Sequence, residues 1–253
     1  MCITISEVFL YMINQVKSKD RISKHGEVFT NEKEVNAMLD LVKNETDRIE
    51  SRFLEPACGN GNFLVEIINR KMKRVERQFK RNFIEYEKNA FLALTSVYGI
   101  DILEDNVREC RRRLFEIWNE KYIAVCKKNL SVEVEEAVKF ILHKNVLCGN
   151  ALTLLDSSNN PIVFSQWDFI IGTKIKRRDY TLDALVNATI PDIDENTGMT
   201  SLADFSGDNN KWEYTDNRMQ QWKYDAETHG WVPSPIREFP LVDYWEVQNV
   251  DEK

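Results

Sequence analysis

The chain has 253 residues, of which 43% are hydrophobic and 30% are charged. This composition supports a large hydrophobic core and excludes disordered and collagen-like chains. No apolar run approaches the roughly 20 residues that a membrane span needs, and the first residues lack the pattern of a signal peptide. The five cysteines are scattered and form no C-x-x-C pair, which argues against a zinc knuckle or a disulfide scaffold. We therefore expect a cytoplasmic protein without a metal site or a membrane contact.

The net charge of −7 is unevenly distributed along the chain. Residues 1–173 hold 25 basic and 25 acidic side chains, whereas residues 174–253 hold 9 basic and 16 acidic ones. The excess of acid therefore lies in the C-terminal part. A nucleic-acid partner would need a local basic patch, because binding to phosphates depends on local rather than net charge.

Hydrophobic spacing and capping residues predict helices that alternate with short strands. In chain order, we expect a helix at 4–18, a helix from an Asn31 N-cap to Val42, a strand at 51–54, a long helix after Phe63, a strand at 96–101, helices at 103–118 and 128–140, and strands at 145–150 and 166–172. Such alternation is typical of a parallel, doubly wound α/β sheet. Beyond Gly172, only 186–190 and 240–247 resemble strands, so this part is either a small appended module or an extended arm.

The long helix after the first strand carries an unusual basic segment. Seven of the twelve residues at 70–81 are basic and one is acidic. Apolar residues recur at Ile67, Met72, Val75 and Phe79, as expected for an amphipathic helix. The segment therefore has two interpretations: a solvated basic face, or a surface that contacts phosphates.

The ends of the predicted strands carry the strongest functional signal, because ligands bind at the carboxyl ends of strands in an open parallel sheet. Gly59-Asn60-Gly61 lies between a strand and a helix. There, two glycines allow a ligand to approach closely and the helix N-terminus presents free N–H groups. Asp101 ends the next strand, at the position that would bind two ribose hydroxyls. Its separation from the glycines exceeds the roughly 20 residues of dinucleotide-binding folds, so NAD is the poorer fit.

Four segments together resemble the motifs of S-adenosylmethionine-dependent adenine-N6 DNA methyltransferases, which include modification subunits of restriction systems. Glu55-Pro-Ala-Cys-Gly-Asn-Gly-Asn-Phe63 resembles motif I. His25-Gly-Glu-Val-Phe-Thr30 resembles the motif that precedes it in the group where the cofactor-binding region comes first. Tyr98-Gly-Ile-Asp-Ile102 resembles motif II, and Gly149-Asn-Ala-Leu152 resembles motif III, with Asn in place of the commoner Asp. The motifs occur in the family's order.

This resemblance implies a fold and a cofactor. The fold is α/β: a Rossmann-like class I methyltransferase core at 46–173 that binds S-adenosylmethionine. An N-terminal helical segment at 1–45 precedes the core, and a basic loop with an irregular, acidic, Trp-rich tail follows at 174–253. The implied cofactor contacts are Phe29 and Thr30 at the methionine part, Glu55, Ala57, Gly59 and Gly61 at the amino-acid and sulfonium end, Asp101 at the ribose, and Ile102, Asn150, Ala151 and Leu152 at the adenine.

Each of these positions also has a purely structural interpretation. Asp101 is a candidate helix N-cap, Asn150 a turn residue that tolerates positive φ, and Phe29 a member of the core. The joint match of four motifs favours the cofactor site over this set of separate structural roles.

The sequence departs from the family at the catalytic loop. After Asp168-Phe-Ile-Ile-Gly172, the family reads Asn-Pro-Pro-Tyr or Asp-Pro-Pro-Tyr, whose groups accept hydrogen bonds from the target amine and stack on the flipped base. This chain reads Thr173-Lys174-Ile175-Lys176 instead, without proline, carboxamide or aromatic ring. The catalytic residues are therefore unknown from sequence, and Asp179-Tyr180 is the alternative from further along the chain.

The replacement itself is basic. Lys174, Lys176, Arg177 and Arg178 place four positive charges where a DNA strand would lie, and we predict that they contact phosphates. The alternatives are a solvated loop and a partner for the acidic tail.

The sequence thus predicts a site-specific adenine-N6 DNA methyltransferase of restriction–modification or phage origin, with weak or absent activity. The first alternative is a catalytically inactive protein that binds S-adenosylmethionine or DNA as a regulatory, decoy or complex subunit. A second is methylation of another acceptor. The complete sheet of the family has further strands after the fourth, besides a target-recognition region. Either the tail completes the sheet in an unusual way or the chain depends on a protein partner.

Overall fold

The computed structural model describes residues 21, 23, 29–186, 222–225 and 230–250. The helix expected at 4–18 and most of the strand expected at 186–190 lie outside these residues. In the part of the chain that is described, no helix is long and apolar enough to cross a bilayer.

Three of the predicted strands form a parallel sheet. β1 (Phe53–Glu55), β2 (Val97–Asp101) and β3 (Val146–Asn150) lie in the order β1-β2-β3, with Glu55 opposite Gly99 and Asp101 opposite Cys148. The two-residue strand β4 (Leu155–Asp156) adds to β3 in the antiparallel direction. The sequence-based prediction of a parallel α/β sheet is therefore confirmed for these three strands.

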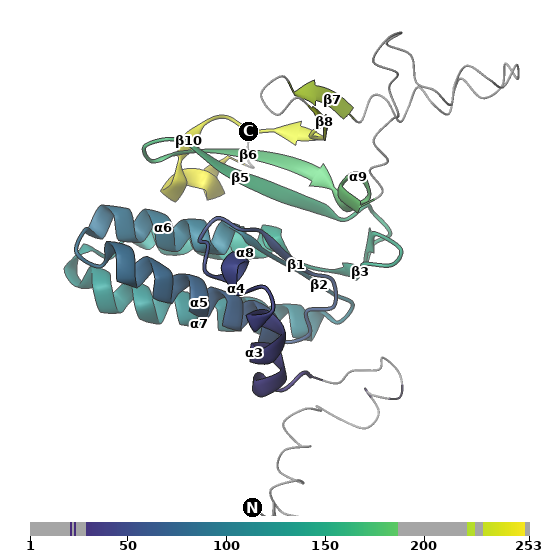
Figure 1. Ribbon diagram of the computed structural model, residues 1–253. Helices are drawn as coiled ribbons and strands as arrows, with labels where there is room; N and C mark the ends of the chain where they lie inside the picture. The colour runs from purple at the N-terminus through teal and green to yellow at the C-terminus, as the bar shows by residue number, and fades with distance from the viewer. Residues whose placement is uncertain (1–20, 22, 24–28, 187–221, 226–229, 251–253) are drawn as a thin grey trace, which may run out of the picture.

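Two helical pairs connect the parallel strands (Figure 1). α5 (Asn62–Phe79) and α6 (Phe83–Thr95) link β1 to β2, and α7 (Glu104–Cys126), a short 3-10 turn (Lys127–Asn129) and α8 (Val132–Asn145) link β2 to β3. α6 was not predicted, and the helix expected at 103–118 continues to Cys126. The helix expected at 128–140 runs from Val132 to Asn145 instead. It begins after Ser131 because the side chain of Ser131 caps it by accepting a hydrogen bond from the Val134 N–H.

The N-terminal described segment packs against α5. α3 (Glu32–Asp40) begins as predicted at an Asn31 N-cap, whose side chain accepts a hydrogen bond from the Glu34 N–H at 3.0 Å. Val35 and Leu39 are buried in the main core. The expected continuation to Val42 is wrong: α3 ends at Asp40 and a separate turn, α4 (Lys43–Thr46), follows.

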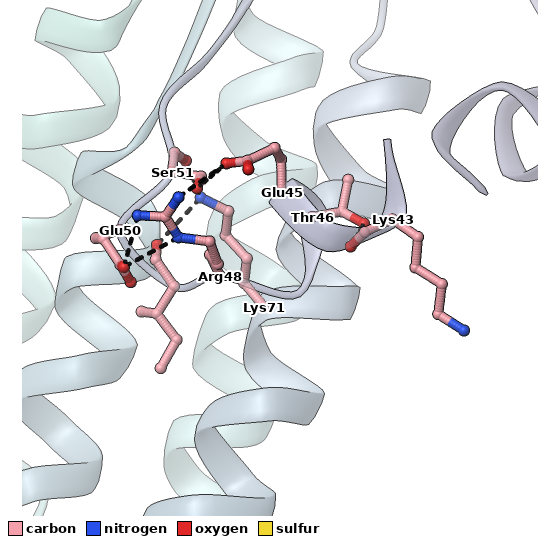
Figure 2. A network of polar contacts seen from close by, with 8 residues as sticks. Lys43, Glu45, Thr46, Arg48, Glu50, Ser51 and Lys71 are labelled. Atoms are coloured by element: carbon pink, nitrogen blue, oxygen red, sulfur yellow. Dashed lines mark hydrogen bonds and ion pairs between the residues drawn. The ribbon is translucent and has the colours of Figure 1, made fainter. Parts of the chain in front are cut away.

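One buried cation joins α5 to the segment before β1 (Figure 2). Lys71 is 0% exposed, and its ammonium donates to the carbonyl oxygens of Ile49 (3.1 Å) and Ser51 and to the Ser96 hydroxyl. Burial lowers the pKa of Lys71 from 10.5 to about 7, because the charged form loses its hydration. α5 is thus attached to this segment by polar contacts as well as by apolar packing.

The two faces of β2 meet different layers, as alternation along a strand requires. Val97 belongs to the core between the sheet and the helices. Tyr98 and Ile100 belong to a second cluster with Phe164 and other residues that follow β4. The Tyr98 hydroxyl donates to the Ser165 carbonyl at 3.0 Å, and the Tyr98 and Phe164 rings meet edge to face at 5.3 Å. The second face of the sheet is therefore covered by the chain that begins near residue 162.

That covering layer is an antiparallel hairpin, which corrects the predicted fourth parallel strand. β5 (Val163–Ile171) pairs with β6 (Lys174–Thr181), and no residue of β5 pairs with the parallel sheet. The turn between them has Gly172 at φ +56°, a conformation that favours glycine and a two-residue hairpin loop. The basic loop expected from Lys174 onward is therefore a strand.

The hairpin runs opposite to the parallel strands. Trp167 Nε1 donates to Asn145 Oδ1 at 2.9 Å, just before β3 begins, and Asp168 forms an ion pair with Arg52, just before β1 begins. Residues 167–168 have thus already reached the amino edge of the sheet. Figure 1 shows the hairpin as a separate layer over the helices. The Gly172 turn follows residues 167–168 along β5 and therefore lies beyond that edge.

The described part of the tail completes this layer. β9 (Arg237–Glu238) and β10 (Val242–Asp243) both pair with β6, and a 3-10 helix (Tyr244–Asn249) packs on α8. The strand expected at 240–247 is therefore only two residues long. The remaining described elements are α9 (Leu182–Val186) and the hairpin of β7 (Trp222–Asp225) with β8 (Gly230–Pro233).

Candidate functional site

The carboxyl ends of β1, β2 and β3 meet at one edge of the sheet. Because these strands are parallel and adjacent, the three polar residues Glu55, Asp101 and Asn150 end at the same edge. This edge is opposite to the one where the Gly172 turn lies. The structure therefore brings together the three strand-end residues that the sequence singled out.

The glycine loop after β1 is folded tightly against its neighbours. Gly59 and Gly61 have φ of +53° and +90°, values that residues with a side chain rarely adopt. A Cβ at Gly61 would lie 2.6 Å from Cys110 Sγ, and one at Gly59 would lie 3.1 Å from the Phe29 ring. Glycine is thus required at both positions, and Phe29 lies directly against the loop, as the cofactor interpretation needs. Phe29 is also buried, so its core interpretation holds as well.

Asp101 holds this loop in place. Its carboxylate accepts hydrogen bonds from the Gly59 N–H and the Leu103 N–H, both at 2.9 Å, and from Asn106 Nδ2 at 3.3 Å. The contact with Leu103 resembles the predicted cap, since α7 begins at the next residue. An ionised carboxylate offers about four acceptor sites, so these three bonds leave capacity for a ligand hydroxyl.

A polar bridge that sequence reasoning missed links three segments around the loop. Arg113 on α7 donates from Nη1 to the Asn60 carbonyl and to Asn62 Oδ1, both at 2.8 Å. Asn62 Nδ2 in turn donates to the Thr30 carbonyl at 2.8 Å. Asn62 stood inside the recognised motif, but nothing in the sequence pointed to Arg113, because its role depends on how α7 packs beside the loop.

Two buried amide atoms near this bridge have no hydrogen-bond partner among the residues that the structure describes. They are Asn60 Oδ1, inside the glycine loop, and Nδ2 of Asn31, which follows Thr30. Buried polar atoms are normally paired. An orphaned acceptor and an orphaned donor beside the loop fit a polar ligand that binds there.

Glu55 is the acidic group closest in sequence to the loop. Its side chain accepts a hydrogen bond from the Ala57 N–H at 3.3 Å, and desolvation by burial raises its pKa. A partly desolvated carboxylate gains from a nearby cation, such as the ammonium group of an amino acid. Glu55 is therefore suited to the amino-acid end of a ligand.

The third strand end offers a turn and exposed apolar side chains. Asn150 Oδ1 accepts a hydrogen bond from the Leu152 N–H at 2.9 Å, which confirms its turn role, but Asn150 does not have the positive φ that this interpretation allowed for. Ile102 and Leu152 are 50% and 94% exposed, whereas Ala151 packs against the second core cluster. Two exposed aliphatic side chains beside an amide are suited to a flat, partly polar ring.

The four residues of the expected catalytic loop lie away from this site. Thr173 Oγ1 and Lys174 Nζ both donate to the Asp243 carboxylate, at 2.5 and 3.0 Å, and these bonds lower the pKa of Asp243. Ile175 is buried in the core, and Lys176 pairs with a tail carboxylate. They form a turn and the start of a strand at the amino edge: Ile175 and Lys176 lie opposite Phe169 and Asp168 in the hairpin, and Thr173 lies in the turn beyond them.

The alternative pair, Asp179 and Tyr180, is also enclosed. Asp179 is 3% exposed and accepts from Arg177 at 2.9 Å and from the Ser165 hydroxyl at 2.7 Å. Tyr180 is 8% exposed and lies opposite Phe164 in the hairpin. Both side chains therefore serve the packing of the hairpin in this structure.

The cations of β6 are paired with carboxylates of the same chain. The ion pairs are Lys174–Asp243, Lys176–Glu238, Arg177–Asp179 and Arg178 with both Asp168 and Glu238. Three of the four residues, Lys174, Lys176 and Arg178, pair with carboxylates of the tail, as one of the two alternatives from the sequence expected. Their contact with DNA stays a prediction, and it now requires the breaking of these pairs.

Comparison with known proteins identifies the family of the chain. The model of the MmeI DNA-methyltransferase domain matches residues 28–173, which include the glycine loop, all three parallel strands and β5. No curated protein and no solved structure matches the chain. The chain therefore belongs to the MmeI DNA-methyltransferase family, of the restriction–modification type.

Proposed function

We propose that the chain binds S-adenosylmethionine at the carboxyl edge of β1–β3, as the cofactor-binding part of an adenine-N6 DNA methyltransferase. The single observation that carries this proposal is the contact between the Gly59 N–H and Asp101, which joins the glycine loop to the end of β2. Phe29 against Gly59 and the orphaned Asn60 oxygen support it.

Each wall of the site has a chemical role toward this cofactor. Asp101 accepts a hydrogen bond from a ribose hydroxyl, and Glu55 faces the ammonium group of the methionine part. Ile102 and Leu152 pack on the faces of the adenine, while Asn150 retains its Nδ2 donor for a ring nitrogen, because only Oδ1 is used in the turn. The cofactor supplies an electrophilic methyl group. Phe29, Thr30, Ala57 and Gly61 complete the set that the motifs assign.

A second candidate function has its own supporting observation. The Gly172 turn lies at the amino edge, and Asp243 binds both Thr173 and Lys174. No group from this segment reaches the cofactor edge to accept hydrogen bonds from an adenine amine. We therefore propose that the chain by itself transfers methyl groups very slowly or not at all, and acts as a cofactor- and DNA-binding subunit whose catalytic loop comes from elsewhere.

The test combines a calorimetric titration of S-adenosylmethionine with a transfer assay on mixed DNA that uses a methyl-labelled cofactor. Asp101→Ala removes a charge-assisted contact to the ribose, worth about 1.5–3 kcal/mol, so the affinity should fall at least tenfold. An unchanged dissociation constant would refute the assignment of Asp101. Asp101 also holds the Gly59 and Leu103 N–H groups with its two oxygens, and Asp101→Asn would keep only one of them as an acceptor. Thermal melting of Asp101→Ala therefore checks that the loop is still folded, which separates loss of the ribose contact from loss of loop structure.

The transfer arm distinguishes the two candidates. Binding with transfer at about one turnover per minute or faster supports the enzyme and refutes the subunit, and binding without transfer does the reverse. The family loop can also be restored by Thr173→Asn, Lys174→Pro, Ile175→Pro and Lys176→Tyr. We expect no gain of activity, because prolines in β6 remove ladder hydrogen bonds and the segment lies at the wrong edge.

A further inference from the structure

The solvent side of α5 carries five cations that the cofactor site does not use. The exposed or half-exposed cations are Lys73, Arg74 and Arg77 in the C-terminal part of the helix, with Lys80 and Arg81 just after its end. Among the residues that the structure describes, none of them lies within 4 Å of a carboxylate oxygen. The cations of β6 differ in this respect, since all four have ion-pair partners.

Helix geometry places these cations in one surface strip, which we call the α5 strip. Lys73 and Arg77 are four residues apart and therefore lie one above the other on the same side of the helix. The opposite side, which includes Leu64, Met72 and Val75, is buried in the core. The buried side fixes the orientation of α5, so the strip faces solvent.

The end of a helix explains only part of this strip. Cations near a helix C-terminus are stabilised by the macrodipole within the last turn, which accounts for Lys80 and Arg81. Lys73 and Arg74 lie more than a turn before the end of α5. From Lys73 to the last residue of α5, Phe79, the helix rises about 9 Å at 1.5 Å per residue, and Lys80 and Arg81 follow in the turn. In B-DNA, a length of about 9 Å corresponds to roughly two or three phosphates of one strand.

The strip lies at the opposite end of α5 from the cofactor edge, since Lys71 already contacts residues just before β1 and β2. α5 begins at Asn62, immediately after the glycine loop (Figure 1). Lys73 is eleven residues further, or about 17 Å along the axis. A duplex that presents a base at the cofactor edge is long enough to reach the strip, since this distance equals about five base pairs at 3.4 Å each.

We propose that the α5 strip holds the phosphate backbone of DNA without reading bases. This inference rests on the proposed function, because it takes DNA as the substrate that the family implies. The acidic tail of the same chain is the other anionic candidate, but two of its described carboxylates, those of Glu238 and Asp243, are already paired with β6. The excess of positive charge on α5 therefore matches an external polyanion better than the described tail.

The experiment measures DNA affinity against salt concentration for three proteins. The test variant is Lys73→Gln, Arg77→Gln and Arg81→Gln together. The matched control removes three charges elsewhere, by Lys43→Gln, Lys127→Gln and Lys139→Gln, all of which are exposed. A labelled 30-base-pair duplex of arbitrary sequence is titrated by fluorescence anisotropy, and circular dichroism with thermal melting checks that each variant is folded.

If the strip contacts phosphates, the slope of log K against log salt becomes shallower by about 2 to 3 in the test variant, at about 0.9 per contact, and not in the control. Equal slopes in all three proteins, an equal decrease in both variants, or no binding by the natural chain would each overturn the proposal. Cofactor titrations are run separately on the same samples. If the natural chain binds no cofactor, the proposed function is refuted, while the comparison of DNA-binding slopes among the three proteins still stands.

Discussion

The buried ammonium of Lys71 predicts an unusual dependence of stability on pH. Its pKa falls from 10.5 in the unfolded chain to about 7 in the folded protein. At about 1.4 kcal/mol per pKa unit, holding the charge in this site costs about 5 kcal/mol below pH 7. Between pH 7 and about 10, the unfolded chain binds more protons than the folded one, so the free energy of unfolding rises with pH.

Lys71→Met removes this titration. Urea unfolding of both proteins between pH 6 and pH 10 should show the natural chain gaining several kcal/mol relative to the variant, because the other titrating groups are common to both and cancel. Lys43→Met is the control: Figure 2 shows its side chain pointing away from the network, and its curve should run parallel to that of the natural chain. Parallel curves for Lys71→Met would refute the reasoning and show that the folded protein keeps an ordinary lysine pKa at this position.

Two predictions concern the walls of the cofactor edge. Arg113→Gln removes the charged donor to Asn62 and Asn60, so cofactor affinity should fall by about tenfold or more, at about 1.5–3 kcal/mol per charged hydrogen bond. Arg113→Lys should recover part of the lost affinity. If calorimetry shows no change in affinity for Arg113→Gln, the bridge has no role in binding. Gly61→Ala forces a Cβ to 2.6 Å from Cys110 Sγ at a positive φ, so we expect a loss of about 1–3 kcal/mol in unfolding free energy. The double variant with Cys110→Ala should regain part of that stability. If the double variant regains none, the close approach to Cys110 is not the cause of the loss.

The parallel sheet and its glycine loop could be predicted because their signals are local. A strand that runs into Gly59-Asn60-Gly61 and a helix specifies its own turn, and Asp101 ends a strand of uninterrupted apolar residues. Parallel order then places the strand ends together without any further information. The structure confirms the three strands and the contact of Asp101 with the loop.

The direction of β5 could not be predicted because it depends on pairing with β6, whose composition does not resemble that of a strand. β6 reads Lys-Ile-Lys-Arg-Arg-Asp-Tyr-Thr, which resembles a solvated loop. Two of its polar residues, Arg177 and Asp179, are buried as an ion pair with each other, and the Arg177 guanidinium lies 4.0 Å from the centre of the Phe239 ring. A strand that buries charges hides the alternation by which strands are normally recognised.

The path of the tail gives β6 a second neighbour. β5 covers one side of β6, whereas the other side is paired with residues 237–243. Until those residues are synthesised, β6 has free N–H and C=O groups along that side, which is the usual starting point for aggregation. Charged side chains, lysine above all, are among the devices that disfavour such pairing. Lys174, Lys176 and Arg178, which form ion pairs in the folded protein, are side chains of this kind on the strand whose second side is covered last.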